Sequence, residues 1–350
     1  MSVAVFGSLN VDLNLTTRKH PRPGETVLGG GGITSAGGKG ANQALAAALA
    51  GATTTMIGKV GEDTNAEIAL ASLRKAGVNL HHVQTSTEPT GLAVVTVAEN
   101  GENTIIVVPG ANGDMDASNL EWAKAALKSA DVLVMQAEVP LECVLEMTKA
   151  AQESGIRTIF NLAPALEIDP VVLRQANPLV VNEHEARTAL RCLKNISDAV
   201  GAADDDAMNA NENVGGGVDD SDAHEDDAKF ADKTNPTDYS EEEAIVRELL
   251  CEGVPSVVAT LGAAGAILGW RQNQNGSETI VTEHVPAAPT QAIDTVGAGD
   301  AFVGVLAAHL GQGKTLQESA QKATRFAAET VKHVGAQDSY WKVHQGMKGK

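Results

Sequence analysis

The sequence predicts an α/β protein with a mainly parallel central sheet, helices on both faces of that sheet, and a small second sheet. Short apolar runs alternate with longer segments of helical character along most of the 350 residues. Polar side chains follow the first apolar run, residues 3–6, and open α/β sheets bind ligands at the carboxyl ends of their strands. Strands that are separated by helices over this length imply parallel pairing and burial on both faces.

The alternation can be followed element by element. Residues 42–52 are alanine-rich and residues 66–76 are followed by Gly77, so both segments are expected to be helices. Similar patterns predict helices at 120–129, 141–154, 183–193 and 241–251 and two more after Asp300. Strands are expected at 53–60, 132–135, 158–160, 179–181 and 256–260, with a strand pair that ends at 285.

Residues 91–109 differ from the rest of the chain in their residue pattern. Two β-rich runs flank the sequence Glu-Asn-Gly-Glu, which is a hairpin signal. Together with residues 26–33, this hairpin is expected to form a small sheet outside the main one. Such a sheet would serve as a lid or as a dimer surface.

The bulk composition excludes several classes of partner. A hydrophobic content of 43% is enough for a large core, and the net charge of −19 argues against nucleic acid or an anionic membrane as a partner. The chain has no run of about 20 apolar residues and no basic leader, so a cytoplasmic protein is expected. Three widely separated cysteines without metal-ligand spacing fit a reducing compartment.

Much of the negative charge lies in one segment. Residues 198–243 hold 16 acidic and two basic residues, and large apolar side chains are almost absent there. Such a composition cannot bury enough surface to offset the entropy of ordering. Residues 195–240 are therefore expected to be a disordered insertion, which is either a passive loop or a regulatory, partner-binding segment.

The stretch Asp-Thr-Val-Gly-Ala-Gly-Asp, residues 294–300, precedes an apolar helical run. The glycines allow a sharp turn, and the free N–H groups at the start of a helix suit a phosphate or a developing oxyanion. Asp300 is then either a cap of that helix or a general base beside a transferred group. This stretch alone leaves both alternatives open.

A second glycine cluster, residues 29–44, places a lysine before a predicted helix. A Walker P-loop is excluded, because Ile33 stands where glycine is required and Gly40 stands where serine or threonine is required. A dinucleotide-binding glycine pattern is also absent after the first strand, since Gly7 is followed by Ser-Leu-Asn.

The two glycine segments, GGKGANQA and DTVGAGDAF, resemble the signature motifs of the PfkB family of carbohydrate kinases. The resemblance extends in order and spacing to FGSLNVDL, PRPGETV, VPGAN, MQAEVP, NLAPA, VNEHEA, TLGAAG and GAQDS. It covers the chain apart from the acidic segment. It implies one domain over residues 1–350, a ribokinase-like three-layer sandwich with a β-sheet lid at about 26–33 and 91–109, and a homodimer formed through that lid.

The resemblance places the sugar contacts at strand ends and in the first glycine loop. Amides and carboxylates suit vicinal diols, because each can pair with two polar hydrogens. The sugar-binding residues that the resemblance implies are Asn10, Asp12, Gly38, Lys39, Gly40, Ala41, Asn42, Glu138 and Asp300.

The resemblance also implies ATP, Mg²⁺ and K⁺. Glu185 would hold Mg²⁺ through water, because that ion gives up its hydration shell reluctantly. The implied ATP contacts are Asn182, Thr260, Leu261, Gly262, Ala263, Ala264, Gly265, Gly299 and Thr324. The implied K⁺ site consists of Asp294, Val296, Thr330, His333, Gly335 and Ser339, although His333 and the neighbouring Tyr340 and Trp341 are bulkier than the family pattern.

The activity that the resemblance implies is ATP-dependent phosphorylation of D-ribose at O5 to give ribose 5-phosphate. Asp300 would accept the hydroxyl proton, and the N–H groups of Val296, Gly297, Ala298 and Gly299 would form an anion hole. Alternatives are a deoxyribokinase, a fructokinase, a ketodeoxygluconate kinase, or a non-catalytic sugar-binding relative. A nucleoside kinase is disfavoured, because an aromatic content of 3% offers little stacking surface for a base.

Overall fold

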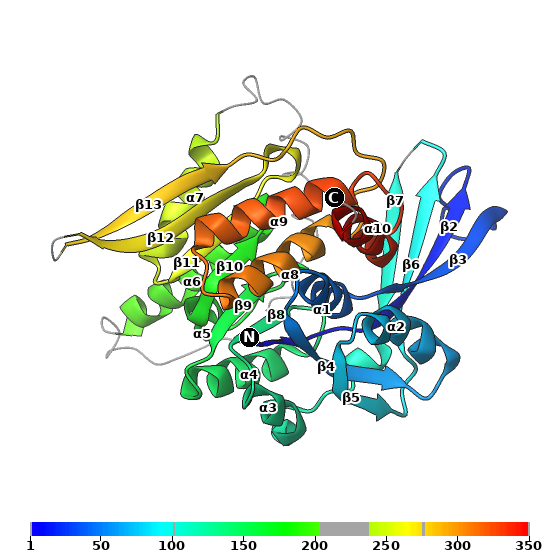
Figure 1. Ribbon diagram of the computed structural model, residues 1–350, viewed down its shortest axis with the longest axis horizontal. Coiled ribbons are helices and arrows are strands. Elements are labelled where there is room, and N and C mark those ends of the chain that lie inside the picture. Colours follow the sequence, from blue (N-terminus) through cyan, green and yellow to red (C-terminus); the bar gives the residue numbers. More distant parts are fainter. Residues whose placement is uncertain (1, 101, 204–237, 275–276, 349–350) are drawn as a thin grey trace, which may run out of the picture.

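The computed structural model describes residues 2–100, 102–203, 238–274 and 277–348, and it is built around a nine-stranded sheet (Figure 1). The strand order is β13-β12-β11-β10-β9-β8-β1-β4-β5. Parallel pairing runs from β11 to β5, and β12 and β13 add an antiparallel edge. The strands are β1 Ser2–Phe6, β4 Thr53–Gly61, β5 Asn79–Ser86, β8 Val132–Gln136, β9 Arg157–Asn161, β10 Ala176–Val181, β11 Ser256–Thr260, β12 Ala266–Gln274 and β13 Ser277–Val285.

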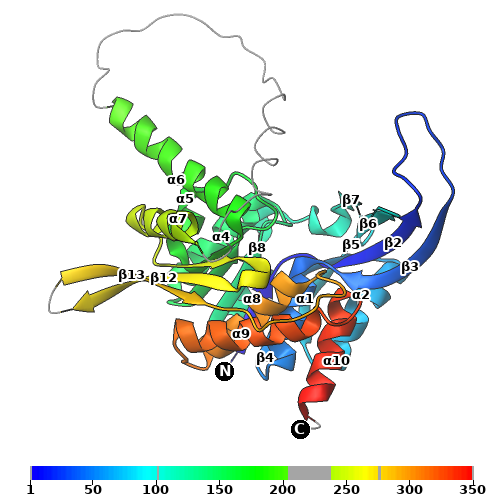
Figure 2. The same ribbon diagram turned by 90° about the horizontal axis from the view of Figure 1, so that it is seen from above.

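Helices cover both faces of this sheet, as the view from above shows (Figure 2). In β1, Val3 and Val5 pack into the core on one face, and Ala4 and Phe6 pack into the core on the other. The first face carries α1 Lys39–Leu49, α2 Thr64–Lys75, α8 Ala298–Gly311, α9 Leu316–Thr330 and α10 Ala336–Lys348. The second carries α3 Glu121–Leu127, α4 Leu141–Glu153, α5 Pro170–Gln175, α6 Glu183–Ala203 and α7 Ser240–Cys251. The three-layer α/β prediction is confirmed.

A separate four-stranded sheet lies at one end of the molecule, beyond α2 and α10 (Figure 1). Its order is β3-β2-β6-β7, with strands at β2 Asn10–Thr17, β3 Gly29–Gly37, β6 Gly91–Ala98 and β7 Asn103–Val108. Strand β2 was not predicted, and β3 begins and ends later than the expected residues 26–33. Glycines without side chains give no apolar alternation from which the ends of β3 could be read.

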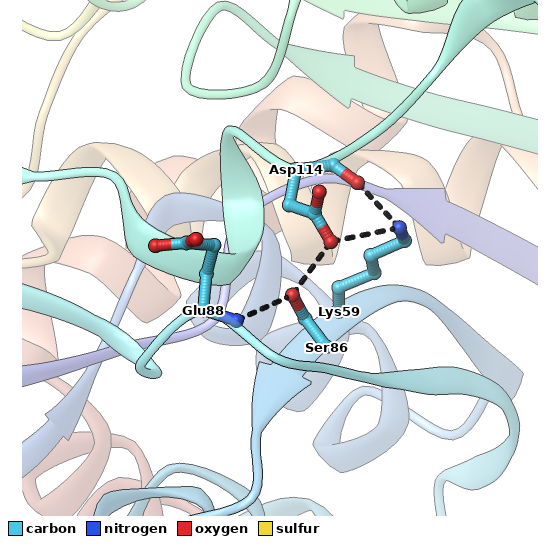
Figure 3. Close-up of polar contacts among 4 residues, drawn as sticks. All are labelled: Lys59, Ser86, Glu88 and Asp114. Atoms are coloured by element: carbon cyan, nitrogen blue, oxygen red, sulfur yellow. Dashed lines mark hydrogen bonds and ion pairs between the residues drawn. The ribbon is translucent and has the colours of Figure 1, made fainter.

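A polar cluster joins this second sheet to the main body (Figure 3). Lys59, near the end of β4, contacts the backbone oxygen of Asp114 and lies 3.3 Å from its Oδ2 atom. Ser86 Oγ donates to the same carboxylate oxygen at 2.6 Å and accepts from the backbone N–H of Glu88 at 3.0 Å. These contacts fix the chain where it leaves β5 for the second sheet and where it returns through the short helix η1, Gly110–Asn112.

The expected insertion at residues 195–240 falls mostly outside the described residues. Its first residues, up to 203, continue α6, and Ser240 opens α7. Within the parts of the chain that the structure describes, no helix has both the length and the apolar character needed to cross a membrane.

Candidate active site

Asp300 lies at the start of α8, where the polar residues of several elements converge. It is the third residue of the helix, and the cap position is taken by Gly297 with a φ of 76°. The capping alternative for Asp300 is therefore wrong. The residue is 8% exposed, and its carboxylate accepts hydrogen bonds from Asn42 Nδ2 at 2.9 Å and from Gln43 Nε2 at 3.0 Å.

Charged side chains from separate elements lie around this carboxylate. Asp12, on β2, fits against Gly37, where a Cβ atom would come within 2.1 Å of Asp12 Oδ1. Burial, together with the nearby Glu138 and Asp300 carboxylates, raises the pKa of Asp12 to about 6, and the charge of Lys39 opposes that rise. Asp300 in turn raises the pKa of the Lys39 ammonium, so Lys39 remains charged despite its burial. The structure thus brings these four predicted residues into one electrostatic cluster.

Glu138 is held firmly beside the first turn of α1. Its Oε2 atom accepts from Ser8 Oγ at 2.5 Å and from the backbone N–H of Lys39 at 3.1 Å. Ser8 Oγ also accepts from the N–H of Gly40 at 3.3 Å, and the N–H of Ala41 donates to the Ser8 carbonyl at 2.9 Å. Ser8 was not expected at the site, although it stands inside the quoted FGSLNVDL motif.

Asn10 is oriented by Asn112, a second residue that the sequence analysis did not assign. Asn112 Nδ2 donates to Asn10 Oδ1 at 2.7 Å, and Asn112 Oδ1 accepts from the N–H of Leu9 at 2.9 Å. Asn10 therefore presents its own Nδ2 group as a donor. The signal for Asn112 was the VPGAN motif, which ends at this residue.

On the other side of Asp300 lies a cavity of about 390 Å³. No lining residue is charged, and most are small: Asn182, Thr260, Gly262, Ala263, Gly265, Ala287, Ala288, Thr290, Ala292, Thr295, Ala298, Gly299, Phe302, Thr324, Ala327, Ala328 and Val331. Seven of the predicted ATP contacts line it, whereas Leu261 and Ala264 do not. The lining residues between 287 and 292 were not predicted, because the loop between β13 and α8 carries no recognisable motif.

Asn182 and Glu185 lie at the edge of this cavity, at the start of α6. The Asn182 N–H donates to Glu185 Oε2 at 2.8 Å, and the Glu185 N–H donates to Asn182 Oδ1 at the same distance. Burial raises the pKa of Glu185 to about 7, and the hydrogen bond from Asn182 and the charge of Lys39 oppose that rise. The charge of Asp300 also contributes to the rise, so the two carboxylates lie close enough to interact electrostatically.

The turn before α8 determines which N–H groups are available there. Val296 donates its N–H to Asp294 Oδ1 at 3.0 Å, and Ala298 donates to the Thr295 carbonyl at 3.2 Å. Within the described residues, the N–H groups of Gly297 and Gly299 have no such acceptor. Tyr340, which is buried, donates its hydroxyl to the Gly297 carbonyl and fixes the turn from the side of α10.

The residues of the expected K⁺ site lie around the loop before α8. Asp294 Oδ2 accepts from the Gly335 N–H at 2.8 Å, and the Asp294 N–H donates to the Val331 carbonyl at 3.1 Å. The buried hydroxyls of Thr330 and Ser339 donate to carbonyls of their own helices. His333, at the end of α9, is half-buried, and its backbone N–H donates to the Thr330 carbonyl.

Comparisons with known proteins identify the family of the chain. The model of the pfkB family of carbohydrate kinases matches residues 1–213 and 223–343. A ribokinase of Schizosaccharomyces pombe is 31% identical over 97% of this chain and 94% of its own. A deoxyribokinase of Salmonella typhi is also 31% identical, over 99% and 97%. The solved structure of Arabidopsis thaliana ribokinase complexed with ribose and ATP superposes with a TM-score of 0.73 at 26% identity and 98% coverage of both chains. The chain belongs to the pfkB family of carbohydrate kinases.

Proposed function

We propose that the protein phosphorylates D-ribose at O5 with ATP. One observation carries the proposal: the Asp300 carboxylate stands at the start of α8 between a cluster of hydrogen-bonding side chains and an uncharged cavity. The first side suits a polyhydroxylated sugar, and the second suits a nucleotide. Relatives named ribokinase and the Arabidopsis thaliana complex with ribose and ATP support the same assignment.

In the proposed reaction, the sugar hydroxyl lies against Asp300 and attacks the terminal phosphorus of ATP. Asp300 accepts the hydroxyl proton as the new oxygen–phosphorus bond forms and the bond to ADP breaks. The N–H groups of Gly297 and Gly299 stabilise negative charge on the transferring group. The expected anion hole is narrower than residues 296–299, because the N–H groups of Val296 and Ala298 already have acceptors.

Glu185 fits the proposed role as a holder of Mg²⁺. One of its carboxylate oxygens accepts from Asn182, and the other has lone pairs to offer to water around the ion. A bound Mg²⁺ would supply positive charge next to the ATP phosphates. Its presence would also favour the ionised form of Glu185, whose pKa is about 7 without it.

The residues around Asp294 fit a monovalent cation better than a transition metal. Among the described residues, no group of three or more His, Cys, Asp or Glu side chains could hold a metal ion. One carboxylate, two hydroxyls and nearby carbonyls form an oxygen set, which suits K⁺. We expect K⁺ to raise turnover, and titration of KCl against NaCl in the kinase assay checks this.

The second sheet supports a proposed homodimer. Its edge strand β7 exposes Ile105, Ile106, Val107 and Val108 by 48–62%, and an exposed apolar edge strand tends to pair with another chain. We expect light scattering to give twice the chain mass. Ile106→Lys should shift the mass toward the monomer, whereas Thr279→Lys on the exposed edge of β13 should not.

The experiment that tests the function is a sugar panel with the wild type and Asp300→Asn. We expect ribose to give the highest kcat/KM and Asp300→Asn to lose turnover by about 10³-fold or more with ATP binding retained. A higher kcat/KM for deoxyribose would favour the second candidate, which the equally similar Salmonella relative supports. Similar kcat values for the wild type and Asp300→Asn would contradict the base assignment.

A further inference from the structure

Gln43 lies next to the proposed sugar contact Asn42 on α1, but it points into the protein. Its side chain is completely buried, and all of its polar groups are in use. Nε2 donates to Asp300 Oδ1 at 3.0 Å and to Asn161 Oδ1 at 3.1 Å, and Oε1 accepts from Gln136 Nε2 at 2.7 Å. These amides come from GGKGANQA, NLAPA and MQAEVP, three motifs in which the proposed function gives them no role.

The orientation of the Gln43 amide follows from its neighbours. Asn161 Nδ2 donates to the Val180 carbonyl at 3.2 Å, so Asn161 Oδ1 faces Gln43 as an acceptor. The NH₂ group of Gln136 faces Gln43 from the other side. A flipped Gln43 would place its oxygen against two acceptors and its NH₂ group against a donor. The surrounding amides therefore fix Gln43 as a donor to Asp300.

The two oxygens of Asp300 are held by different kinds of residue. Oδ2 accepts from Asn42, whose own Oδ1 accepts from Gln337 Nε2 at 3.0 Å. Asn42 is also a proposed sugar contact, so its effect on Asp300 and its effect on the sugar cannot be separated by mutation. Gln43 is buried behind Asp300 and contacts only protein groups.

Several titratable groups face Asp300 from the elements packed around it. They are Lys39 on α1, Asp12 on β2, Glu185 on α6 and the Tyr340 hydroxyl on α10. Of these, only Lys39 is cationic at neutral pH. A neutral donor that stays in place whether or not sugar is bound is therefore an independent source of stabilisation for the carboxylate.

We propose that Gln43 is a positioning residue for the reaction: it holds the Asp300 carboxylate in the geometry of a base and favours its ionised form. This inference rests on the proposed role of Asp300 as the base. Asn161 acts through Gln43, because its anchored Oδ1 acceptor fixes the direction of the Gln43 amide.

The test uses Gln43→Met, which keeps the length of the side chain and removes the donor. A hydrogen bond to a charged group contributes about 1.5–3 kcal/mol, which corresponds to about 10- to 160-fold. We expect kcat to fall by about that factor while the KM for the sugar changes by less than about threefold. We also expect the acidic limb of the kcat against pH profile to move up by about one pH unit, because the carboxylate without its donor protonates more easily.

A second variant protects the test against a failure of Gln43→Met to fold. Asn161→Leu leaves Gln43 in place but removes the acceptor that orients it. We expect the same direction of change in kcat and in the acidic limb, with a smaller amplitude. In the double variant the two effects should not add, since both act on one donor.

Ser256→Ala serves as the control for loss of a buried hydrogen bond. Ser256 is 5% exposed at the start of β11 and donates to Asn177 Oδ1 at 2.7 Å. This pair lies at the amino ends of β10 and β11, whereas the site lies at the carboxyl ends of the parallel strands. The Ser256→Ala variant should have a lower unfolding temperature, but the acidic limb of its kcat against pH profile should stay where it is in the wild type. General destabilisation by Gln43→Met would lower kcat but leave the acidic limb of the pH profile unchanged. That result overturns the inference.

Asp300→Asn is measured in parallel to separate the two levels of proposal. If Asp300→Asn turns over like the wild type, the base assignment fails and the role of Gln43 fails with it. If Asp300→Asn is inactive but Gln43→Met keeps the wild-type kcat and pH profile, the base assignment stands and only the role of Gln43 is overturned.

Discussion

The residues on the two sides of Asp300 differ in charge and in size. On the side proposed for the sugar, Asp12, Lys39 and Glu138 are half-buried charges that interact with one another, and Glu138 also accepts a hydrogen bond from Ser8. On the side proposed for the nucleotide, the cavity is lined mainly by glycine, alanine and threonine and has no charged side chain in its lining. The first side recognises its ligand with side chains, and the second recognises it with backbone and shape.

This difference predicts how substitutions on each side should affect binding and stability. A charge that loses its buried partner is left uncompensated, so a single substitution on the sugar side should have a large and specific effect. A cavity lined by small residues should lose little binding energy when one contact is removed. It cannot accept an added Cβ atom, however, where two backbone segments are in contact. Four experiments test this contrast, beginning with the largest expected effect.

Lys39→Met removes the cation that faces Asp300, Glu138 and Asp12. We expect kcat/KM for the sugar to fall by about 10²-fold or more, because three carboxylates then share one buried space. The dissociation constant of ATP, measured by calorimetry, should change by less than about threefold. Lys149→Met, which removes an exposed ion pair with Glu146, should leave both values within about twofold. An equal loss of sugar and ATP affinity in Lys39→Met would show that the two sides are not independent.

Gly265→Ala tests the tolerance of the nucleotide side. Gly265 has a φ of 100°, and a Cβ atom there would lie 2.1 Å from the Val285 carbonyl oxygen. Because the backbone must shift, we expect a loss of about 2–4 kcal/mol in the free energy of unfolding and weaker ATP binding.

Gly262→Ala, in the same loop, is the matched control. Gly262 has a φ of 55°, and a Cβ atom there would meet nothing within 4 Å. It should cost only about 1–2 kcal/mol of left-handed backbone strain. If urea unfolding gives equal losses of unfolding free energy for the two alanine variants, the backbone conformation, and not the close contact with Val285, causes the destabilisation.

Asp12→Asn tests the burial of charge on the sugar side through pH. The pKa of Asp12 is about 6 in the folded protein against 3.8 for an unperturbed group, so the folded state binds more protons than the unfolded state between these values. This carboxyl therefore makes the protein less stable as pH rises from about 4 to about 6, by up to about 3 kcal/mol.

The measurement for Asp12 is urea unfolding between pH 4 and pH 7.5. The difference in the free energy of unfolding between the wild type and Asp12→Asn should decrease over that range and then become constant. A difference that stays flat from pH 4 onward would show that Asp12 titrates normally and is not desolvated.

Thr324→Val should give the smallest change. Thr324 Oγ1 is buried and has no hydrogen-bond partner among the described residues, so its removal should alter the free energy of unfolding by less than about 1 kcal/mol. The KM for ATP should rise a few-fold if the hydroxyl contacts ATP, as the family resemblance implies. A KM that does not change would remove Thr324 from the proposed ATP contacts while leaving the cavity assignment intact.

The main sheet was readable from the sequence because burial on both faces leaves a strong local pattern. β8 and β11 are apolar runs beside amphipathic helices, and they lie where the pattern predicted. The second sheet was harder to read. Its strand β2 mixes polar and apolar residues because it carries Asn10 and Asp12 into the site, and β3 begins with glycines.

The candidate site was predictable where a motif carried the residue. Asp12, Lys39, Glu138 and Asp300 were expected, and the structure brings them together. Ser8, Asn112 and Gln43 were missed, since each acts on another side chain rather than on a ligand. Such roles depend on distances between side chains that are about 30 to 260 residues apart in the chain, which no local pattern records.

The sequence by itself determined the alternating architecture, the family resemblance and the residues that meet at the sheet edge. The reason is that burial period, helix-ending glycines and short motifs are local properties of the chain. Only the tertiary structure decided that Asp300 is not a helix cap, that its carboxylate is held from behind by the Gln43 amide, and that no charged side chain lines the cavity beside it. These features arise from the packing of α1, α8 and the strand ends against one another, and hydrogen-bond direction exists only once those elements are in place.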